Sequence, residues 1–456
     1  MKGETSSSIK SGSNEQQCEA NCRTPRMQSV DSEMRKKSRE DYDAERSICL
    51  TRWILKPIGA WPALFGTSRL EKCYYRTMNV LCYFFILFIF VPCGLYTLYD
   101  VPVLYQKIKL TGPLSFCVMC AAKYSSLIFA GKDIHRCIEQ IIEDWSIIKH
   151  EKDRAIMTEN AIFGRQLIII CSSFLYGSML FFYVVLPLSM GKVAAEGENF
   201  TYIQIPLPVA SVLPDPRKSP ANEIFFLGQM VCGLTLHTIS ASVYSLIAVF
   251  VMHACGQLEV LMVWLEHLVD GREDLSKDAV DRMAMIVERH IRTISFVNRT
   301  EKIFRNISLV EVMGCTLNMC LDGYYLIMVW NCKSMILMNG CFLFSFTFNI
   351  FILCYIGELV AGQCKKVGDA TYLTDWYKMP GNSALGLILI ITSCNSGTRL
   401  TAGNFMDLTI ATFGDVSKFC VISFFIENIL ILYIFVVTGG KDIGCLLEHA
   451  ESTHFL

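Results

Sequence analysis

Four ionisable residues lie inside long apolar stretches of this sequence, namely Lys123, Glu311, Asp322 and Glu427. Charged side chains within membrane-spanning helices are rare and are functional candidates by default. Glu311 and Asp322 are eleven residues apart, about three helical turns, so they share one helix face. They could form a polar lining for ions. Alternatively, Glu311 lies at the inner membrane interface and Asp322 pairs with a neighbour such as Lys123. We favour the second interpretation.

Other residue patterns that could carry chemistry are weak. Cys117-Val-Met-Cys120 has redox or metal spacing, but it falls in an apolar run without further ligands, and buried thiols are ordinary. Metalloprotease, phosphate-loop and nucleophile-elbow motifs are absent. His237 is expected to make a structural hydrogen bond rather than bind a ligand. We therefore predict that the chain is not an enzyme and has no catalytic residue, metal or cofactor.

Aromatic and methionine side chains gather in the outer halves of the apolar segments. Small apolar ligands bind in concave sites lined in this way, with a few polar groups for orientation. Lipid-facing or helix-packing roles explain most such residues equally well. The candidate ligand-binding residues are Phe116, Met119, Tyr176, Met179, Tyr183, Phe226 and Gln229.

Composition and apolar runs predict an all-α membrane protein. Charged residues make up 18% of the chain, against ~25% in soluble domains. A helical crossing needs roughly 20 mostly apolar residues. Seven segments satisfy this: 78–98, 110–130, 167–188, 224–251, 309–330, 336–355 and about 405–437. The nine-residue run ALGLILIIT is too short to cross.

The distribution of Lys and Arg predicts the orientation of these seven helices. With the N-terminus inside, the cytosolic parts hold 31 of these residues and the outer parts hold 7. Because positive residues favour the cytosolic side, we expect a cytosolic N-terminus and an extracellular C-terminus. Among the sequons at Asn199, Asn298 and Asn306, only Asn199 then faces the lumen during synthesis, so only it should be glycosylated.

The segments outside the membrane divide the chain further. Residues 1–45 are polar and lack an apolar signal segment, so we expect a disordered cytosolic leader. Residues 46–437 form the transmembrane domain, and residues 438–456 form an atypical C-terminal tail.

Two segments with the periodicity of a helix are expected to extend the transmembrane domain on the cytosolic side. A helix over 224–268 would be ~67 Å long, twice the hydrocarbon thickness, and an amphipathic stretch over 279–305 leads into the fifth span. They predict a helical bundle below the membrane. It either packs on itself or serves as a platform for subunit contacts.

Seven strings in this sequence resemble signatures of the insect odorant receptor family. In chain order they are RWILKPIGAWP, IQIPLPVASVLPDPRKSPANEIFFLGQ, HACGQLEVL, RHIRTISFVNRTEKIF, FILCYIGELV, YLTDWYKMP and LTAGNFMDLTIATFGDVSK. The resemblance runs from about Asp41 to about Lys418. Its specificity comes from the order and spacing of the strings rather than from any one of them.

The resemblance implies an odorant-binding subunit of a tetrameric, ligand-gated, non-selective cation channel. Such a subunit assembles with the shared co-receptor at the plasma membrane of olfactory sensory neurons. It binds small volatile ligands among spans two, three, four and six, and its cytosolic extensions hold the subunits together. The co-receptor's long cytosolic insertion before the fifth span is missing here, so a tuning subunit is the better match. Membrane lipid is an expected partner and nucleic acid is not.

The family's last span lines the pore, which an apolar stripe can close by dewetting. Helical spacing from Phe419 places Ile422, Ile426 and Leu430 on one face, so these are the candidate pore residues. After Lys418 the sequence departs from the family's usual ending. Glu427 is therefore either a cation-attracting group or a residue of an atypical tail.

Three alternatives remain open at this point. A seven-span G-protein-coupled receptor would need its N-terminus outside, against the Lys and Arg distribution. A secondary transporter would be expected to show internal repeats, and none is found. A gustatory receptor is the nearest relative within the same class, but its Thr-Tyr…Gln-Phe ending is not present.

Overall fold

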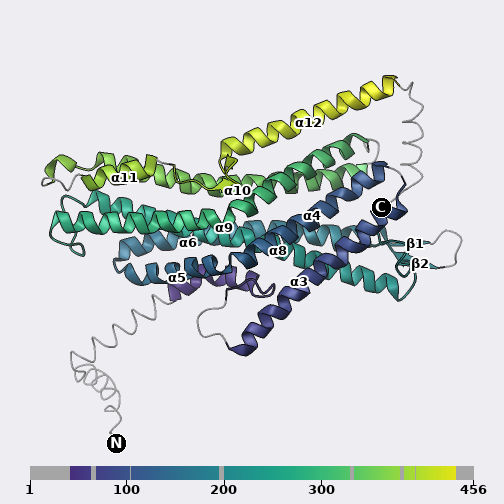
Figure 1. The fold of residues 1–456 in the computed structure, drawn as a ribbon, viewed down its shortest axis with the longest axis horizontal. Coiled ribbons are helices and arrows are strands. Elements are labelled where there is room, and N and C mark those ends of the chain that lie inside the picture. Colours follow the sequence, from purple (N-terminus) through teal and green to yellow (C-terminus); the bar gives the residue numbers. More distant parts are fainter. Residues whose placement is uncertain are drawn as a thin grey trace, which may run out of the picture.

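The structure, a computed structural model, describes residues 42–62, 68–102, 104–194, 200–328, 333–379, 385–395 and 397–437. Most of the described chain is helical (Figure 1). Residues 42–55 form a first helix. The elements that follow are α3 (Arg69–Leu95), η1 (Tyr96–Asp100), α4 (Leu104–Phe129), α5 (Gly131–Ile147), α6 (Glu151–Leu180), η2 (Phe181–Val185), α7 (Leu186–Met190), β1 (Lys192–Ala194), β2 (Thr201–Ile203), α8 (Ala221–Glu266), α9 (Ala279–Met328), α10 (Lys333–Leu373), η3 (Trp376–Lys378), α11 (Leu385–Asn395), β3 (Thr401–Ala402), β4 (Met406–Asp407) and α12 (Ile410–Val437).

Five helical segments of the described chain are long and apolar enough to cross a membrane. They cover Arg69–Asp100, Gln106–Phe129, Glu151–Ser189, Ala221–Glu266 and Asn339–Leu373. They cover predicted spans one, three and four in full and most of spans two and six. The fifth predicted span, 309–330, begins in the second half of α9, and its last two residues lie outside the described residues. The seventh, from about 405 to 437, begins in the β3–β4 hairpin and continues as α12. The predicted short run is α11, an 11-residue helix.

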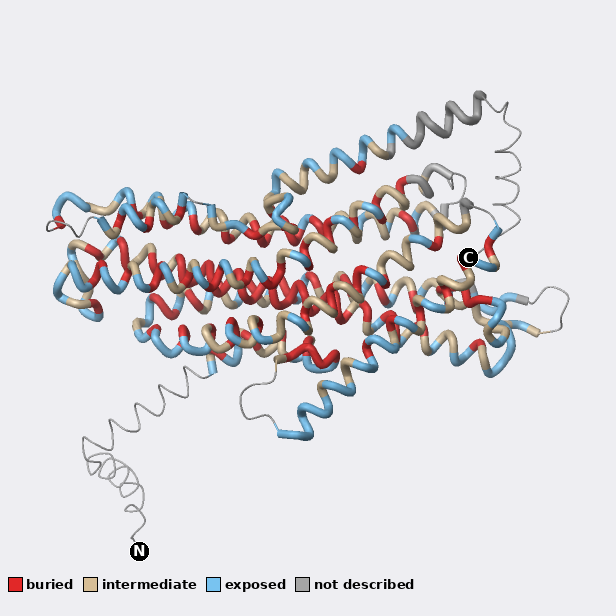
Figure 2. Tube along the Cα trace, in the orientation of Figure 1, coloured by how far each residue is buried: buried red, intermediate tan, exposed pale blue. Residues whose placement is uncertain are grey.

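The other helices pack around α8. In the most apolar 18-residue stretch of α8, 83% of the residues are buried inside the protein. The corresponding stretches of the four other candidate spans are only 22–39% buried. A helix that is apolar on all sides is stable only inside a protein or a membrane, and α6, α9 and α10 pack along this one. Figure 2 shows the buried residues concentrated along these helices, in the half of the molecule that holds α5.

The predicted helical extensions are present. α8 has 46 residues, α9 has 50 and α10 has 41, so each is on the order of 60–75 Å long and exceeds the hydrocarbon thickness. With α5 and α11 they form a bundle at one end of the molecule (Figure 1). Because the interior of this bundle is buried within a single chain, the bundle packs on itself.

The first helix begins at residue 42, within the segment 1–45 that we predicted to be a disordered leader. Ala44 and Ile48 are buried in the core, and the Arg154 Nε–H donates to Asp43 Oδ2 at 2.8 Å. Residues 42–45 therefore belong to the folded domain, because burial and a charged contact hold them there. Residues 1–41 and the tail 438–456 lie outside the described residues.

Two short antiparallel hairpins complete the fold. β1 pairs with β2 in the register Lys192 to Ile203, and β3 pairs with β4 in the register Thr401 to Asp407. The second hairpin turns at Gly403 and Asn404, whose φ angles are +62° and +59°. Positive φ at both central residues is typical of a type I′ hairpin turn.

The β3–β4 hairpin determines where α12 begins. The Gly403 N–H donates to the Arg305 carbonyl oxygen at 3.0 Å, and the Thr401 hydroxyl donates to Glu301 Oε1 at 2.6 Å. The Ile410 N–H, at the start of α12, donates to Glu358 Oε2 of α10 at 3.2 Å. The last long helix is thus docked on α9 and α10 through this hairpin.

Replacing Gly403 with Val should prevent this docking. A side chain there needs a left-handed backbone, which costs roughly 1–2 kcal/mol. Its Cβ would also lie 2.6 Å from Leu309 Cδ2, and such overpacking typically costs about 1–3 kcal/mol. We expect a lower melting temperature in detergent and less protein at the cell surface. Gly177→Ala is the control, because a Cβ there meets nothing within 4 Å. An unchanged melting temperature for Gly403→Val would contradict the prediction.

Candidate functional site

The structure brings two of the predicted ligand-binding residues together around His237 of α8. The His237 ring centroid lies 5.3 Å from that of Phe116 on α4 and 6.3 Å from that of Tyr183 in η2. η2 is a π-helical turn, and such turns are rare and frequently lie at functional sites. We call Phe116, Tyr183 and His237 the aromatic site.

Gly233 allows the close approach of η2 to α8. A Cβ at this position would lie 2.6 Å from Tyr183 Cε2, so only glycine leaves room for the tyrosine ring. His237 follows Gly233 by four residues, one helical turn, and therefore lies on the same face of α8. Sequence reasoning missed both residues as part of a site. A glycine followed by a lone imidazole one turn later was the available signal, but the sequence did not show which ring would pack against them.

Four more of the predicted residues make other contacts or lie elsewhere. The Tyr176 hydroxyl donates to Thr238 Oγ1 at 3.2 Å, next to His237. Met179 is buried on the same stretch of α6. Met119 is directed to α9 instead, because a Cβ on Gly314 would lie 2.1 Å from its sulfur. Phe226 is half-buried near the start of α8.

Gln229, the one amide among the predicted ligand contacts, holds the loop of residues 203–220 that precedes α8. Its Oε1 accepts from the Leu207 N–H at 2.9 Å, and its Nε2 donates to the Leu207 carbonyl oxygen at 2.8 Å. Asn222, two turns earlier on α8, makes the same pair of bonds with the backbone of Ile203, at 3.1 and 2.8 Å. The two amides thus clamp the loop onto α8, and the Gln229 amide is already paired on both sides.

A buried ion pair lies beside the aromatic site. Lys123 Nζ is 2.7 Å from Glu311 Oε2 and 2.8 Å from Ser240 Oγ, and the Lys123 side chain is 1% exposed. The Tyr244 hydroxyl donates to Glu311 Oε1 at 2.9 Å. Lys123 Nζ also lies 5.9 Å from the ring centroid of Phe116, within cation–π range. Together these residues join α4, α8 and α9.

This arrangement corrects our interpretation of the two acids of α9. Lys123 pairs with Glu311 and not with Asp322, and Glu311 is buried in the helix packing rather than placed at an interface. Asp322 lies about 16 Å further along α9, at 1.5 Å per residue, which is too far for the same lysine. Its Oδ2 is buried without a hydrogen-bond partner among the described residues.

A second charged cluster joins α5, α8 and α9 in the bundle beyond the spans. Asp144 Oδ2 lies 3.0 Å from His253 Nε2, and the Arg292 Nε–H donates to Asp144 Oδ1 at 2.9 Å. Burial alone would raise the pKa of Asp144, but the hydrogen bond from His253 and the charges of Arg289 and Arg292 outweigh it and lower the pKa. A cavity of about 20 Å³, enough for a water molecule, lies beside His253 and Trp145.

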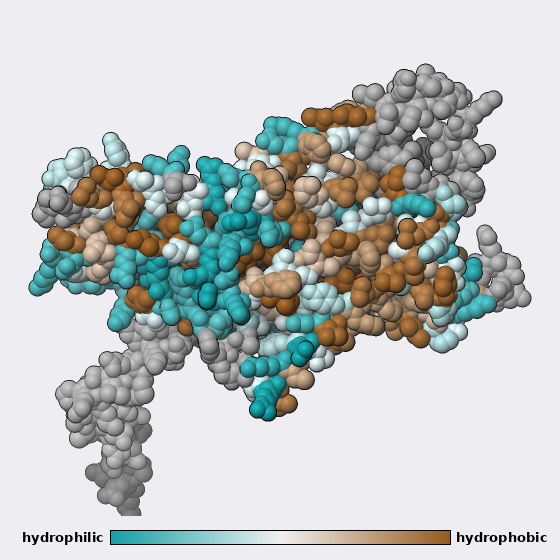
Figure 3. All heavy atoms as spheres, viewed as in Figure 1, coloured by the Kyte–Doolittle hydropathy of each residue, from teal (hydrophilic) through white to brown (hydrophobic). Residues whose placement is uncertain are grey.

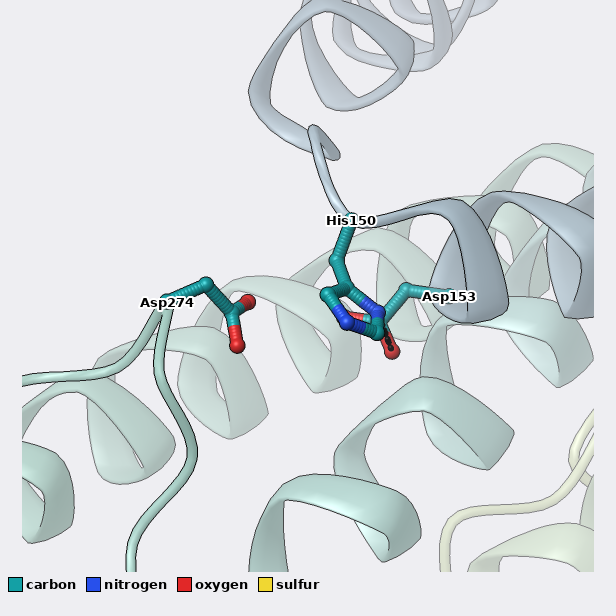
Figure 4. A group of neighbouring side chains, drawn as sticks. All are labelled: His150, Asp153 and Asp274. Atoms are coloured by element: carbon teal, nitrogen blue, oxygen red, sulfur yellow. Dashed lines mark ion pairs between the residues drawn. The ribbon is translucent and has the colours of Figure 1, made fainter.

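His150, Asp153 and Asp274 form the one cluster of the described residues with metal-ligand spacing. Figure 4 shows the three side chains turned toward one another, from the start of α6 and from the loop before α9. Arg272 binds both carboxylates, with its Nη2 2.7 Å from Asp153 Oδ2 and 2.8 Å from Asp274 Oδ2. The Trp264 indole N–H also donates to Asp153, at 2.8 Å. A cation would have to displace Arg272, so this cluster is a salt-bridge network that ties the loop to α6.

α12 diverges from the bundle after its docked start (Figure 1). Phe413 packs on Phe351 of α10, with ring centroids 5.4 Å apart, and Cys420 is buried. The predicted pore residues Ile422 and Ile426 are 56% and 59% exposed in the single chain. The side chains of Glu427 and Leu430 lie outside the described residues, so their predicted roles stay predictions.

Hydrophobic residues gather over the right half of the surface in Figure 3, between a hydrophilic region near α5 and a hydrophilic rim at β1 and β2. This hydrophobic surface region, together with the five apolar segments, defines an all-α, multi-pass membrane protein. Residues 106–421 match the family model of the 7tm odorant receptors. The chain belongs to this family, which is one of receptors and not of enzymes. The match favours neither a G-protein-coupled receptor nor a transporter.

Individual relatives and solved structures agree with the family match. The chain is 22% identical to odorant receptor 82a of Drosophila melanogaster over 203 residues, 44% of this chain and 52% of the relative. It is 22% identical to odorant receptor 10 of Aedes albopictus over 210 residues, 45% and 56% of the two chains. The aligned part thus spans about half the length of these relatives. The fold matches the olfactory receptor OR5 of Machilis hrabei in complex with eugenol, with a TM-score of 0.69, 14% identity, and coverage of 84% of this chain and 97% of that one.

Replacing Lys123 with Met should destabilise the protein strongly. The substitution leaves the Glu311 carboxylate buried without its partner, and breaking a buried pair typically costs about 3–5 kcal/mol. We expect loss of the cooperative thermal transition of the receptor purified in detergent. Adding Glu311→Gln to Lys123→Met should recover much of the melting temperature, because the unpaired charge is gone. A double variant no more stable than the single one would show that the pair does not act as we describe.

Proposed function

We propose that this chain is an odorant-binding subunit of a ligand-gated, non-selective cation channel. The observation that carries the proposal is the position of the aromatic site. Phe116 is part of that site, and its ring also lies against the ammonium group of Lys123. Lys123 in turn pairs with Glu311 on α9. A ligand that moves the Phe116 ring would therefore change the surroundings of the ion pair.

α9 would carry such a change to the last helix. Glu311 lies two residues from Leu309, which packs against Gly403, and six residues from Arg305, whose carbonyl oxygen accepts from Gly403. The ion pair and the hairpin that docks α12 are thus about 9 Å apart along one rigid helix, at 1.5 Å per residue. In this proposal α12 lines the pore with Ile422, Ile426 and Leu430, and their apolar face closes it by dewetting.

We propose small volatile molecules with an apolar or aromatic body as the ligands. Phe116, Tyr183 and Tyr176 offer ring faces, and rings favour offset or edge-on contact with other aromatic groups. The similar receptor OR5 was solved with eugenol, which supports this class of ligand. Met119, Met179, Phe226 and Gln229 stay predicted contacts.

The proposed partner is the shared co-receptor in a hetero-tetramer at the plasma membrane of olfactory sensory neurons. The bundle that packs on itself still presents apolar side chains on α11, where Leu385, Ile388 and Leu389 are 61%, 58% and 53% exposed. Exposed apolar groups gathered on one short helix are typical of interaction surfaces. We therefore propose this end as the platform for subunit contacts.

Whole-cell recording tests the channel proposal. Cells that express this chain with the co-receptor should show volatile-evoked cation current across a broad panel, and cells that express either protein alone should lack that response. A parallel chain, with the residues after Lys418 replaced by the family's usual ending, tests whether the native α12 can serve a pore. If only the chain with the replaced ending gives current, the native residues after Lys418 prevent channel activity. Silence of both chains, with both labelled at the surface, would overturn the proposed function.

The orientation is also a proposal, supported by the Lys and Arg distribution. With the N-terminus cytosolic and the C-terminus extracellular, Asn199 lies on the outer side, although it is outside the described residues. Treatment with endoglycosidase should shift the protein's mobility in a gel, and Asn199→Gln should abolish the shift. A shift that persists in this variant would mean that Asn298 or Asn306, both within α9, faces the lumen and that the orientation is wrong.

A further inference from the structure

The hydrogen bond of His237 determines which of its ring nitrogens carries the proton. Nδ1 lies 2.8 Å from the carbonyl oxygen of Gly233. A carbonyl oxygen only accepts hydrogen bonds, so Nδ1 must carry the hydrogen and donate it. If the ring is neutral, Nε2 then has a free lone pair and acts as an acceptor.

The surroundings of His237 favour the neutral ring. The ring packs on the same Phe116 side chain that lies against Lys123, with Nζ 5.9 Å from the Phe116 centroid. The Tyr183 ring lies edge-on to it, with the centroids 6.3 Å apart. A second positive charge among these apolar rings, near the Lys123 ammonium, would be poorly solvated and repelled. Nε2 is therefore an acceptor in the resting site.

This acceptor is unused in the described chain. The bond to Gly233 is the one hydrogen bond that His237 makes with the described residues, and the residue is only half-buried. Two hydroxyl groups next to His237 already have partners: the Tyr176 hydroxyl donates to Thr238 Oγ1, and the Thr238 hydroxyl donates to the Leu234 carbonyl oxygen. Nε2 is thus available to a ligand that lies against Phe116 and Tyr183.

We propose that His237 determines ligand specificity and that its Nε2 selects volatile ligands that carry a hydroxyl group. This inference rests on the proposed function and names the ligand class of the same site. A phenol or alcohol donates its O–H to Nε2 while its apolar body packs on the two rings. An ether or ester of the same shape has no O–H to donate, so Nε2 stays without a hydrogen bond. The partial negative charges of Nε2 and of the ligand oxygen also repel each other.

Matched pairs of ligands test the proposal in cells that express this chain with the co-receptor. The probes are 4-methylphenol against 4-methylanisole, and benzyl alcohol against benzyl methyl ether. We expect the hydroxyl member of each pair to activate at a concentration on the order of tenfold lower, since a net hydrogen bond is worth up to about one decade. Equal potency, or preference for the ethers, would overturn the inference.

Variants separate specificity from folding. His237→Phe keeps an aromatic ring but removes the acceptor, so the preference for the hydroxyl member should disappear while the ether response persists. His237→Gln restores an acceptor and should recover part of the preference. His267→Phe is the matched control, because His267 makes the same type of bond to the carbonyl oxygen of Val263, at 2.9 Å, but lies at the other end of α8. This variant should leave the preference unchanged. Retention of the preference in His237→Phe, or an equal loss in His267→Phe, would overturn the role of His237.

The outcomes distinguish this inference from the proposed function. Responses to volatiles that do not depend on the hydroxyl group would retain the channel proposal and refute the role of His237. Silence toward the whole panel, with chain and co-receptor both labelled at the surface, would overturn the proposed function and this inference with it.

Discussion

The cost of an unpaired charge in the apolar interior constrains how α4, α8 and α9 can pack. Lys123 and Glu311 have lost their water, and each is stabilised by the other and by hydroxyl groups of Ser240 and Tyr244. Either charge left alone in such surroundings would be strongly destabilising. Any motion of these helices must therefore keep the pair together or replace one of its contacts. This makes the register of α9 against α4 and α8 specific, and the Asp144 cluster does the same for α9, α8 and α5 further along the bundle.

That register determines the geometry of the two functional regions. On one side, Lys123 lies against Phe116, so the aromatic site with Tyr183 and His237 is built on the same α4 and α8 surfaces. On the other, α9 continues from Glu311 to Leu309 and Arg305, where the β3–β4 hairpin docks and α12 begins. α9 thus carries both contacts within a few turns, and it connects the aromatic site, our proposed ligand site, with the start of α12, our proposed pore helix.

Side-chain hydrogen bonds to the backbone hold the segment of residues 203–220 that precedes α8. Asn222 and Gln229 each bind a backbone N–H and a carbonyl oxygen of the loop, and Asp100 of η1 accepts from the Ser211 N–H at 2.7 Å. The backbone groups of an irregular loop need such partners, and these bonds fasten the loop over α8 and the end of α3. A residue that looked like a polar ligand contact, Gln229, thus has a structural partner that the sequence could not reveal.

The sequence by itself determined the fold class, because long apolar runs and the 3.6-residue periodicity of their extensions are local properties. It therefore predicted α8 and α9 as continuous helices reaching beyond the membrane, and α11 as too short to cross. It also placed charges inside the spans. Only the tertiary structure decided that Lys123 pairs with Glu311 and leaves Asp322 apart, that Gly233 makes room for Tyr183, and that His237 packs against the rings of Phe116 and Tyr183. These contacts join residues that are fifty or more positions apart in the sequence. The direction of a side chain across a helix interface is set by the partner helix rather than by the residues next to it in the chain.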